Sequence, residues 1–141
     1  MIKKLLLIFC NIYLISNLFA DWIVPPSSLP QNAISFIQRV YPNVQIWKVE
    51  IDDGKYEVKL SNGTEIDFLH NGDWVSIDGE YNGVPLTVLP EYVANTIRRI
   101  YPQAIMIEVE KKWDNYKIKL NNMMKLYISY DGQLMGQKWD D

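Results

Sequence analysis

An internal repeat is the feature that most constrains the fold of this chain. When residue n is laid over residue n + 60, the two copies align without a gap, one opening at Leu29-Pro30 and the other at Leu89-Pro90. Further identical pairs are Ile37 and Ile97, Arg39 and Arg99, Tyr41 and Tyr101, Pro42 and Pro102, Val49 and Val109, Glu50 and Glu110, Tyr56 and Tyr116, Lys59 and Lys119, Leu60 and Leu120, Asn62 and Asn122, and Gly72 and Gly132. Such a period indicates one supersecondary unit used twice. A unit of about 60 residues is marginal on its own, so we expect the copies to share one core.

Each copy begins with the pattern of an amphipathic helix. Pro30 suits a first helical turn, where its missing N–H costs nothing, and Pro42 ends the run. The apolar positions at helical spacing are Ala33, Ile34, Ile37, Val40 and Tyr41 in the first copy, and Val93, Ala94, Ile97, Ile100 and Tyr101 in the second. Each helix therefore has one face to bury.

After each Tyr-Pro pair the apolar period changes from 3.6 to 2, which predicts four strands per copy. The turns between them are marked by Asp52-Asp53-Gly54, Asn62-Gly63, Asn71-Gly72 and Asp131-Gly132. The predicted fold class is α+β: two tandem α-β-β-β-β repeats forming a mainly antiparallel sheet with two helices on one face. In this alternation Trp47 is in phase with Val49, and Ile105 and Ile107 are in phase with Val109, so we expect these side chains in the core.

The N-terminus predicts export. Residues 1–20 combine Lys3-Lys4, an apolar run and Ala20 before Asp21, the pattern of a cleaved signal peptide. A retained anchor helix is the alternative, because the bulky Leu18 lies three residues before the cut. Phe9 before Cys10 disfavours a lipid-modified cysteine. We expect a periplasmic protein with an extended lead-in at 21–28, a first repeat at 29–80, a linker at 81–88 and a second repeat at 89–141.

The charge of the mature chain limits its partners. Loss of Lys3 and Lys4 leaves 14 − 2 = 12 basic against 17 acidic residues, a net charge of −5, and no cysteine. An acidic total with interspersed signs argues against nucleic acid or an anionic membrane as a partner.

The motifs of the repeat resemble those of the PepSY-like family of exported bacterial proteins. They are Leu-Pro opening a helix, Tyr-Pro ending it, and then Tyr56-Glu57-Val58-Lys59-Leu60, Asn62-Gly63-Thr64-Glu65-Ile66-Asp67-Phe68 and Asn71-Gly72-Asp73-Trp74. The resemblance covers 29–77 and 89–134, and departs from the pattern at Met123-Met124 and Leu134. The family is related in fold to the beta-lactamase inhibitory protein, which suggests inhibition of a protein or peptidase. That inhibitor's target contacts are not motif residues of the repeat, so none carries over.

No residue pattern indicates an enzyme. His70, the single histidine, lacks a second histidine, cysteine or acidic pair at ligand spacing. Asp52-Asp53 and Asp78-Gly79-Glu80 fit turns better than a calcium loop. Ser27, Ser28 and Ser35 lack a nucleophile elbow. We predict no catalytic residue, no metal and no cofactor.

The candidate binding surface is the sheet face away from the helices. Alternation places six polar residues of each copy there: Lys48, Glu50, Glu57, Lys59, Glu65 and Asp67, then Glu108, Glu110, Lys117, Lys119, Lys125 and Tyr127. The sign reverses between equivalent sites, and such polarity orients a docking partner. Together with three tryptophans outside the predicted core, the predicted binding residues are Trp22, Glu57, Glu65, Asp67, Trp113, Lys117, Lys125, Tyr127 and Trp139. The predicted function is non-enzymatic docking of an envelope protein or peptide, with inhibition or modulation as the outcome. The alternative is a small-ligand carrier or sensor with a pocket between helix layer and sheet.

Overall fold

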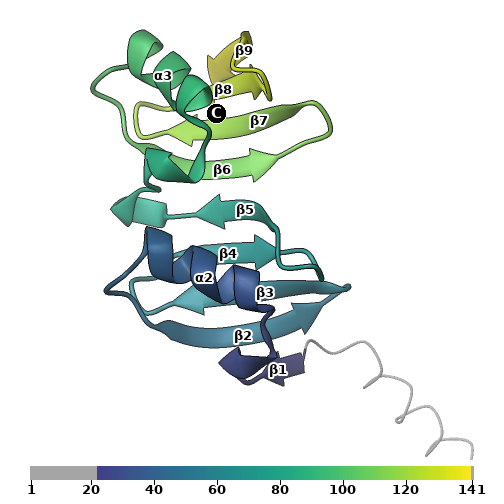
Figure 1. The fold of residues 1–141 in the computed structure, drawn as a ribbon. Coiled ribbons are helices and arrows are strands. Elements are labelled where there is room, and N and C mark those ends of the chain that lie inside the picture. Colours follow the sequence, from purple (N-terminus) through teal and green to yellow (C-terminus); the bar gives the residue numbers. More distant parts are fainter. Residues whose placement is uncertain (1–21, 141) are drawn as a thin grey trace, which may run out of the picture.

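The computed structural model describes residues 22–140, arranged as two helices and nine strands (Figure 1). The helices are α2 (Gln31–Val40) and α3 (Glu91–Ile100). The strands are β1 (Trp22–Val24), β2 (Ile46–Asp52), β3 (Lys55–Leu60), β4 (Glu65–Phe68), β5 (Trp74–Asp78), β6 (Met106–Lys111), β7 (Asn115–Leu120), β8 (Met124–Ser129) and β9 (Leu134–Trp139). The predicted signal peptide, residues 1–20, lies outside the described residues.

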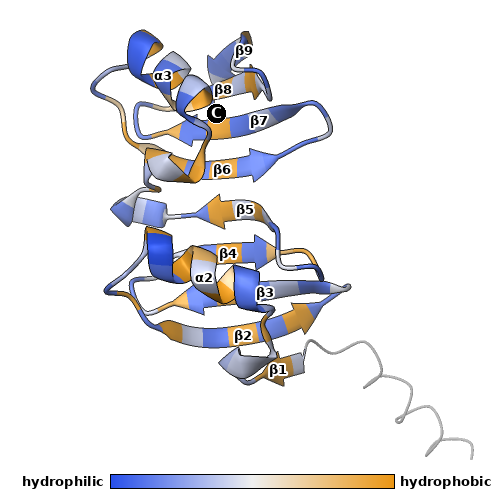
Figure 2. Cartoon of the chain, viewed as in Figure 1, coloured by the Kyte–Doolittle hydropathy of each residue, from blue (hydrophilic) through white to orange (hydrophobic). Residues whose placement is uncertain are grey.

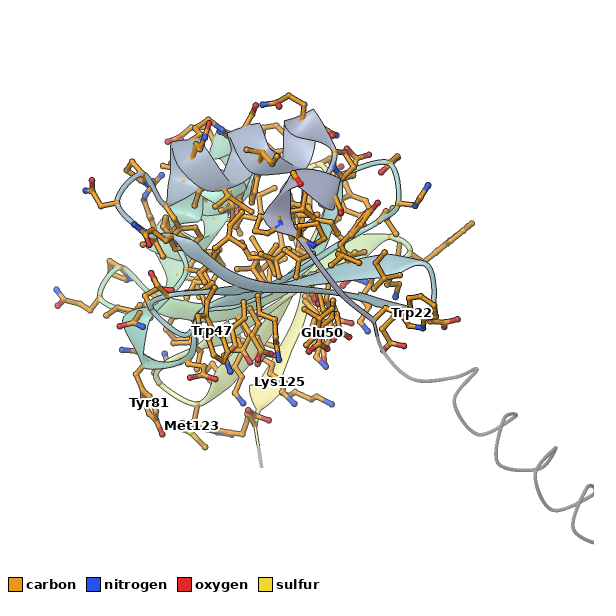
Figure 3. The ribbon with its side chains drawn as sticks, turned by 90° about the horizontal axis from the view of Figure 1, so that it is seen from below. Trp22, Trp47, Glu50, Tyr81, Met123 and Lys125 are labelled. Atoms are coloured by element: carbon orange, nitrogen blue, oxygen red, sulfur yellow. The ribbon has the colours of Figure 1, made fainter. Side chains whose placement is uncertain are left out.

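All nine strands form one antiparallel sheet in the order β1 to β9. The two repeats join where β5 pairs with β6, with Ile77 opposite Val109. Both helices cover one face of this sheet, and the other face is open (Figures 1 and 3). The predicted α+β class and its two α-β-β-β-β repeats are confirmed.

The helices of the two repeats have the same bounds after a shift of sixty residues, and they end in the same way. The N–H of Tyr41 donates to the carbonyl of Ile37 at 2.8 Å, and the N–H of Tyr101 donates to that of Ile97 at 2.9 Å. Both tyrosines leave helical geometry with φ near −130° (−127° and −134°). The proline that follows each tyrosine disfavours continued helix at that residue.

The connecting segments hold more structure than the sequence pattern indicates. Trp22–Val24 of the expected lead-in is an edge strand that pairs with β2, and Pro25 and Pro26 end it. Short 3₁₀ turns occupy Pro26–Ser28, Glu80–Asn82 and Leu86–Val88. The segment between the repeats is thus a pair of tight turns beside a continuous sheet.

One hydrophobic cluster runs through both repeats. Within it the ring of Trp74 lies 6.2 Å from Phe36 of α2 and 6.4 Å from Tyr116 of β7, centroid to centroid. Trp74 therefore connects the helix of the first repeat to a strand of the second. Hydrophobic and hydrophilic residues alternate along the strands (Figure 2), and buried and less buried positions alternate in the same way in β3 and β8.

A β-bulge at the same place in each repeat corrects the predicted core. The register shifts between Ile46 and Lys48 in β2 and between Met106 and Glu108 in β6. A bulge puts two residues opposite one and so inverts the side-chain phase before it. Trp47 is 66% exposed and Ile105 is 53% exposed, so the expectation that they are core was wrong; Met106, at 1% exposed, is buried instead.

Candidate functional site: the open face of the sheet

The open face carries a row of charged residues in direct cross-strand register, one from each of eight strands. Its members, from β2 to β9, are Lys48, Lys59, Glu65, Asp78, Glu108, Lys119, Lys125 and Lys138. We call this the first charge row. Its signs run two basic, three acidic, three basic. With strands about 4.8 Å apart, it spans roughly 34 Å of the sheet.

A second row lies beside it on the same face. Its members are Glu50, Glu57, Asp67, Ser76, Glu110, Lys117, Tyr127 and Gly136. Over β2 to β6 the two rows together hold two lysines and seven carboxylates, 2 − 7 = −5. Over β7 to β9 they hold four lysines, +4. The face is therefore polarised along the sheet, acidic over β2 to β6 and basic over β7 to β9.

Each repeat has a shallow depression in its part of the open face, at equivalent positions. The first, about 220 Å³, is lined by Lys48, Glu50, Glu57, Val58, Lys59, Glu65 and Asp67. The second, about 250 Å³, is lined by Glu108, Val109, Glu110, Lys117, Lys119 and Lys125. Such hollows accommodate single side chains rather than a whole small-molecule ligand of usual size.

The charges within the two depressions are balanced differently. In the first, the Nζ of Lys59 lies 3.4 Å from Glu65 across the strands, and that of Lys48 lies 2.7 Å from Glu50. In the second, Lys119 and Lys125 lie 2.5 Å and 2.7 Å from the carboxylate of Asp140. Hydrogen bonds from Lys119 and then Lys125 lower the pKa of Asp140 from 3.8 to about 2.

Two carboxyl groups of the acidic part have pKa values raised by burial. Burial raises the pKa of Asp67, although Ser76, whose Oγ donates to it at 3.1 Å, opposes the shift. Burial also raises the pKa of Glu108, and its cross-strand neighbour Asp78 adds to the effect. Burial therefore makes ionisation of these two carboxyl groups less favourable, and a positive group of a partner placed nearby would favour it.

Large apolar side chains border the charged rows. Figure 3 shows Trp47, Tyr81 and Met123 on the side of the sheet opposite the helices, together with Glu50 and Lys125. The exposed fractions of the three apolar side chains range from 53% for Met123 to 103% for Tyr81. Lysines from the first charge row, Lys48 and Lys59, lie 5.5 Å and 5.8 Å from the centre of the Trp47 ring. Aromatic side chains are enriched in protein interfaces relative to the rest of a protein surface.

The structure brings six of the nine predicted binding residues together in the two rows. These are Glu57, Glu65, Asp67, Lys117, Lys125 and Tyr127. Trp22 lies on the other face, because its cross-strand partner Ile51 pairs in turn with Tyr56, which is buried on the helix side. Trp113, 97% exposed, borders a hollow that reaches Asp67 and Glu110. Trp139 lies apart, because its cross-strand partner Met124 is buried on the helix side.

Sequence reasoning missed Trp47, Asp78, Lys138 and Asp140 at this surface. The sixty-residue shift pairs Asp78 with Lys138, so extending the sign comparison along the repeat would have found both. Asp140 reaches the face only through the tertiary fold.

Of the residues weighed for chemistry, Asp78 belongs to the first charge row, whereas His70 belongs to neither row. His70 stacks on the ring of Tyr56 at 6.0 Å between centroids. Between residues 22 and 140, no group of three His, Cys, Asp or Glu side chains is placed to hold a metal. No helix in the described range is long and apolar enough to cross a membrane. Asp78 Oδ1 accepts the N–H of Glu80 at 2.9 Å, the local hydrogen bond of a turn.

A wider groove lies on the helix side, between α2 and the seam of the repeats. It measures about 700 Å³, and its lining includes Phe36, Arg39, Trp74 and Lys111. The Nζ of Lys111 lies 4.0 Å from the centre of the Trp74 ring, which also packs against Phe36 and Tyr116 and is 8% exposed. The ammonium group of Lys111 therefore covers the aromatic surface at the base of this groove.

Fold and surface together define a two-copy sheet module with a helix-covered face and an open charged face. The family described as "Putative beta-lactamase-inhibitor-like, PepSY-like" matches residues 20–64 and 54–136. The chain belongs to this family, and the resemblance seen in the sequence motifs is confirmed. A comparison with curated proteins finds no match.

Three solved structures of similar fold come from Bacteroides species. One, from Bacteroides vulgatus, is described as a "putative periplasmic protein" and is 24% identical, covering 84% of this chain and 96% of its own, with a TM-score of 0.78. Another, from Bacteroides thetaiotaomicron, is described as a "putative calcium-regulated periplasmic protein" and is 23% identical, with the same coverages and TM-score. A third, also from Bacteroides vulgatus, is described as a "putative periplasmic protein of unknown function" and is 22% identical over 84% of this chain and 99% of its own, again at 0.78. These likenesses establish the fold.

Proposed function

We propose that this protein is a non-enzymatic periplasmic module that docks an envelope protein or peptide on the open face of its sheet and thereby modulates it. The observation that carries the proposal is the polarised pair of charge rows, bordered by exposed aromatic side chains. Membership of an inhibitor-like family and the periplasmic description of the similar structures support it. Complementary charge across such a face sets the orientation and the association rate of a partner.

The acidic and basic parts of the open face suggest where each segment of a docked partner would lie. A basic segment would lie over β2 to β6, where the rows sum to −5, and an acidic segment over β7 to β9. The aromatic groups at the border, Trp47 and Tyr81 among them, would exclude water around these contacts.

The proposed export depends on the N-terminal signal. The intact mass of protein recovered from its own cells should therefore correspond to a chain that begins at Asp21.

Photo-crosslinking in the native cells tests the docking face. Tyr127 lies in the second charge row, and Tyr92, 54% exposed, lies on α3 on the opposite side of the sheet. We expect p-benzoylphenylalanine at position 127 to give a discrete adduct with one envelope protein, and the same residue at position 92 to give none. An adduct from position 92 alone, or none from either position, would contradict docking on the open face.

The groove beside α2 supports a second candidate function, a small-ligand carrier or sensor. Its volume of about 700 Å³ is within the range of ligand sites, and Phe36 and Trp74 contribute aromatic lining. Native mass spectrometry of protein purified from its own envelope would show a bound small molecule of constant mass if this function holds. Replacement Lys111→Ala would uncover the Trp74 ring and should then change the retained amount.

A further inference from the structure

At three neighbouring positions of the first charge row, the two repeats share one lysine and differ in sign at the other two. Lys59, Glu65 and Asp78 of the first repeat become Lys119, Lys125 and Lys138 of the second. We call the last three residues the lysine row. In the first repeat the pattern is self-compensating, because Lys59 pairs with Glu65 at 3.4 Å. In the second repeat three like charges stand side by side.

Like charges directly opposite each other in adjacent strands destabilise a sheet, since their Cβ atoms lie about 4.5–5.5 Å apart. The lysine row therefore requires an anion from elsewhere. Asp140 supplies one: its carboxylate bridges Lys119 at 2.5 Å and Lys125 at 2.7 Å. Only 13% of the Asp140 side chain remains exposed, so the carboxylate is largely covered where it bridges the two lysines.

The backbone places Asp140 there. It follows β9 directly, and its N–H donates to the carbonyl of Met123 at 2.8 Å, which continues the β8–β9 ladder by one residue. Its equivalent in the first repeat, Glu80, lies in the 3₁₀ turn after β5, and its N–H donates to Asp78. The bridge by Asp140 is thus specific to the second repeat. It leaves Lys138 of the same row without an ion pair among residues 22–140.

We propose that the lysine row is a carboxylate-binding site for an acidic segment of the docked protein, and that Asp140 occupies this site in the free protein and is displaced when the partner binds. The inference rests on the proposed function for the existence of a partner and adds the chemistry of its recognition. A peptide carboxylate makes the same charge-assisted hydrogen bonds to lysine that Asp140 makes. Several carboxylates in one segment would also reach Lys138 and Lys117, which Asp140 does not contact.

If Asp140 competes with an outside carboxylate for the lysine row, removing the Asp140 carboxylate should strengthen binding. When a site is free only part of the time, the apparent affinity for an outside ligand falls by that fraction. Asp140→Asn removes the carboxylate and keeps the backbone hydrogen bond to Met123. Its affinity for an acidic peptide should therefore rise by on the order of fivefold or more.

The experiment uses the peptide acetyl-Asp-Asp-Asp-Asp-amide as the probe, titrated into the mature protein and followed by heteronuclear NMR. We expect tighter binding by Asp140→Asn than by the wild type, with shift changes on β7 to β9. The double variant Lys119→Gln/Lys125→Gln should lose binding. The matched control is Lys59→Gln, at the equivalent position of the first repeat, which should bind as the wild type does.

Equal or weaker binding by Asp140→Asn would overturn the proposal, as would shift changes confined to the first repeat. A second readout does not depend on this variant: in the wild type, the amide of Asp140 should shift together with those of β7 and β8 as the peptide displaces it. A stationary Asp140 amide at saturation would also overturn the proposal. The crosslink from position 127 reports independently, so an adduct there with no effect of Asp140→Asn would leave the docking function intact and exclude this mode of recognition.

Discussion

Asn32 of α2 and Gly72 of the β4–β5 turn fit so closely that a Cβ on Gly72 would lie 2.1 Å from the Oδ1 of Asn32. The Nδ2 of Asn32 donates to the neighbouring carbonyl of Asn71 at 3.0 Å, which fastens the helix to the hairpin. Gly72 also has φ = +90°, a conformation that costs other residues about 1–2 kcal/mol. The turn thus depends on glycine for two separate reasons.

Gly72→Ala should lower the free energy of unfolding by about 1.5–3.5 kcal/mol, because backbone strain adds to the loss of the Asn32–Asn71 hydrogen bond when the Asn32 side chain is pushed aside. Urea denaturation measures this loss. The control is Gly63→Ala, which has the same φ of +90° but its nearest atom at an ordinary 3.7 Å, so only the strain of about 1–2 kcal/mol applies. Equal losses in the two variants would show that the contact with Asn32 contributes nothing.

Met123→Gly should stabilise the protein. Met123 occupies the position equivalent to Gly63 and adopts φ = +68° in the β7–β8 turn, with its side chain 53% exposed. Glycine would relieve the left-handed strain and lose little buried apolar contact, so we expect a gain of about 0.5–1 kcal/mol in urea denaturation. A loss of stability would mean that the Met123 side chain makes a contact worth more than the strain.

Trp74→Ala should destabilise both repeats together. The side chain is 8% exposed and packs between Phe36 and Tyr116, so its removal should cost about 3–5 kcal/mol. Because the two repeats share one core, unfolding followed by circular dichroism should remain a single transition at a lower midpoint. Trp113→Ala, at a side chain 97% exposed, should change stability by less than about 0.5 kcal/mol. Two separated transitions in the wild type would contradict a shared core.

Asp67→Asn and Asp140→Asn should alter stability with opposite signs at neutral pH. The folded pKa of Asp67 is raised by burial, so its ionisation opposes folding above that pKa. Asp67→Asn should therefore stabilise at pH 7 by less than about 1 kcal/mol, and this gain should vanish as the pH falls below 3.8. The folded pKa of Asp140 is lowered to about 2, so its stabilisation is present above 3.8 and is lost as the pH falls through about 2.

Asp140→Asn should thus be less stable than the wild type at pH 7 and converge with it near pH 2. Thermal melts of the three proteins between pH 2 and pH 7 measure both effects. Curves that stay parallel across this range would exclude a contribution from either ionisation.

The architecture could be predicted because its signals are local and occur twice. Leu-Pro and Tyr-Pro mark the ends of both helices, and Asn-Gly or Asp-Gly marks most hairpins, since these residues accept backbone conformations that others resist. Alternation then correctly assigned six of the predicted binding residues, including Glu65 and Lys125, to the open side of the sheet.

Trp47 could not be placed in this way, because a one-residue bulge leaves no clear mark in composition and yet inverts every side chain before it. The strand at Trp22–Val24 was hidden by its shortness and by the two prolines after it. Both errors concern register, which pairing between strands settles rather than the local sequence.

The repeat, its helices and its turns follow from residues close together in the chain, where backbone preferences and apolar spacing act directly. The single sheet, the continuous row from Lys48 to Lys138 and the bridge from Asp140 to Lys119 and Lys125 arise only when strands come into register. Charges that are neighbours on the face lie up to thirty residues apart along the chain, as Asp78 and Glu108 do, so their interaction exists only in the folded state.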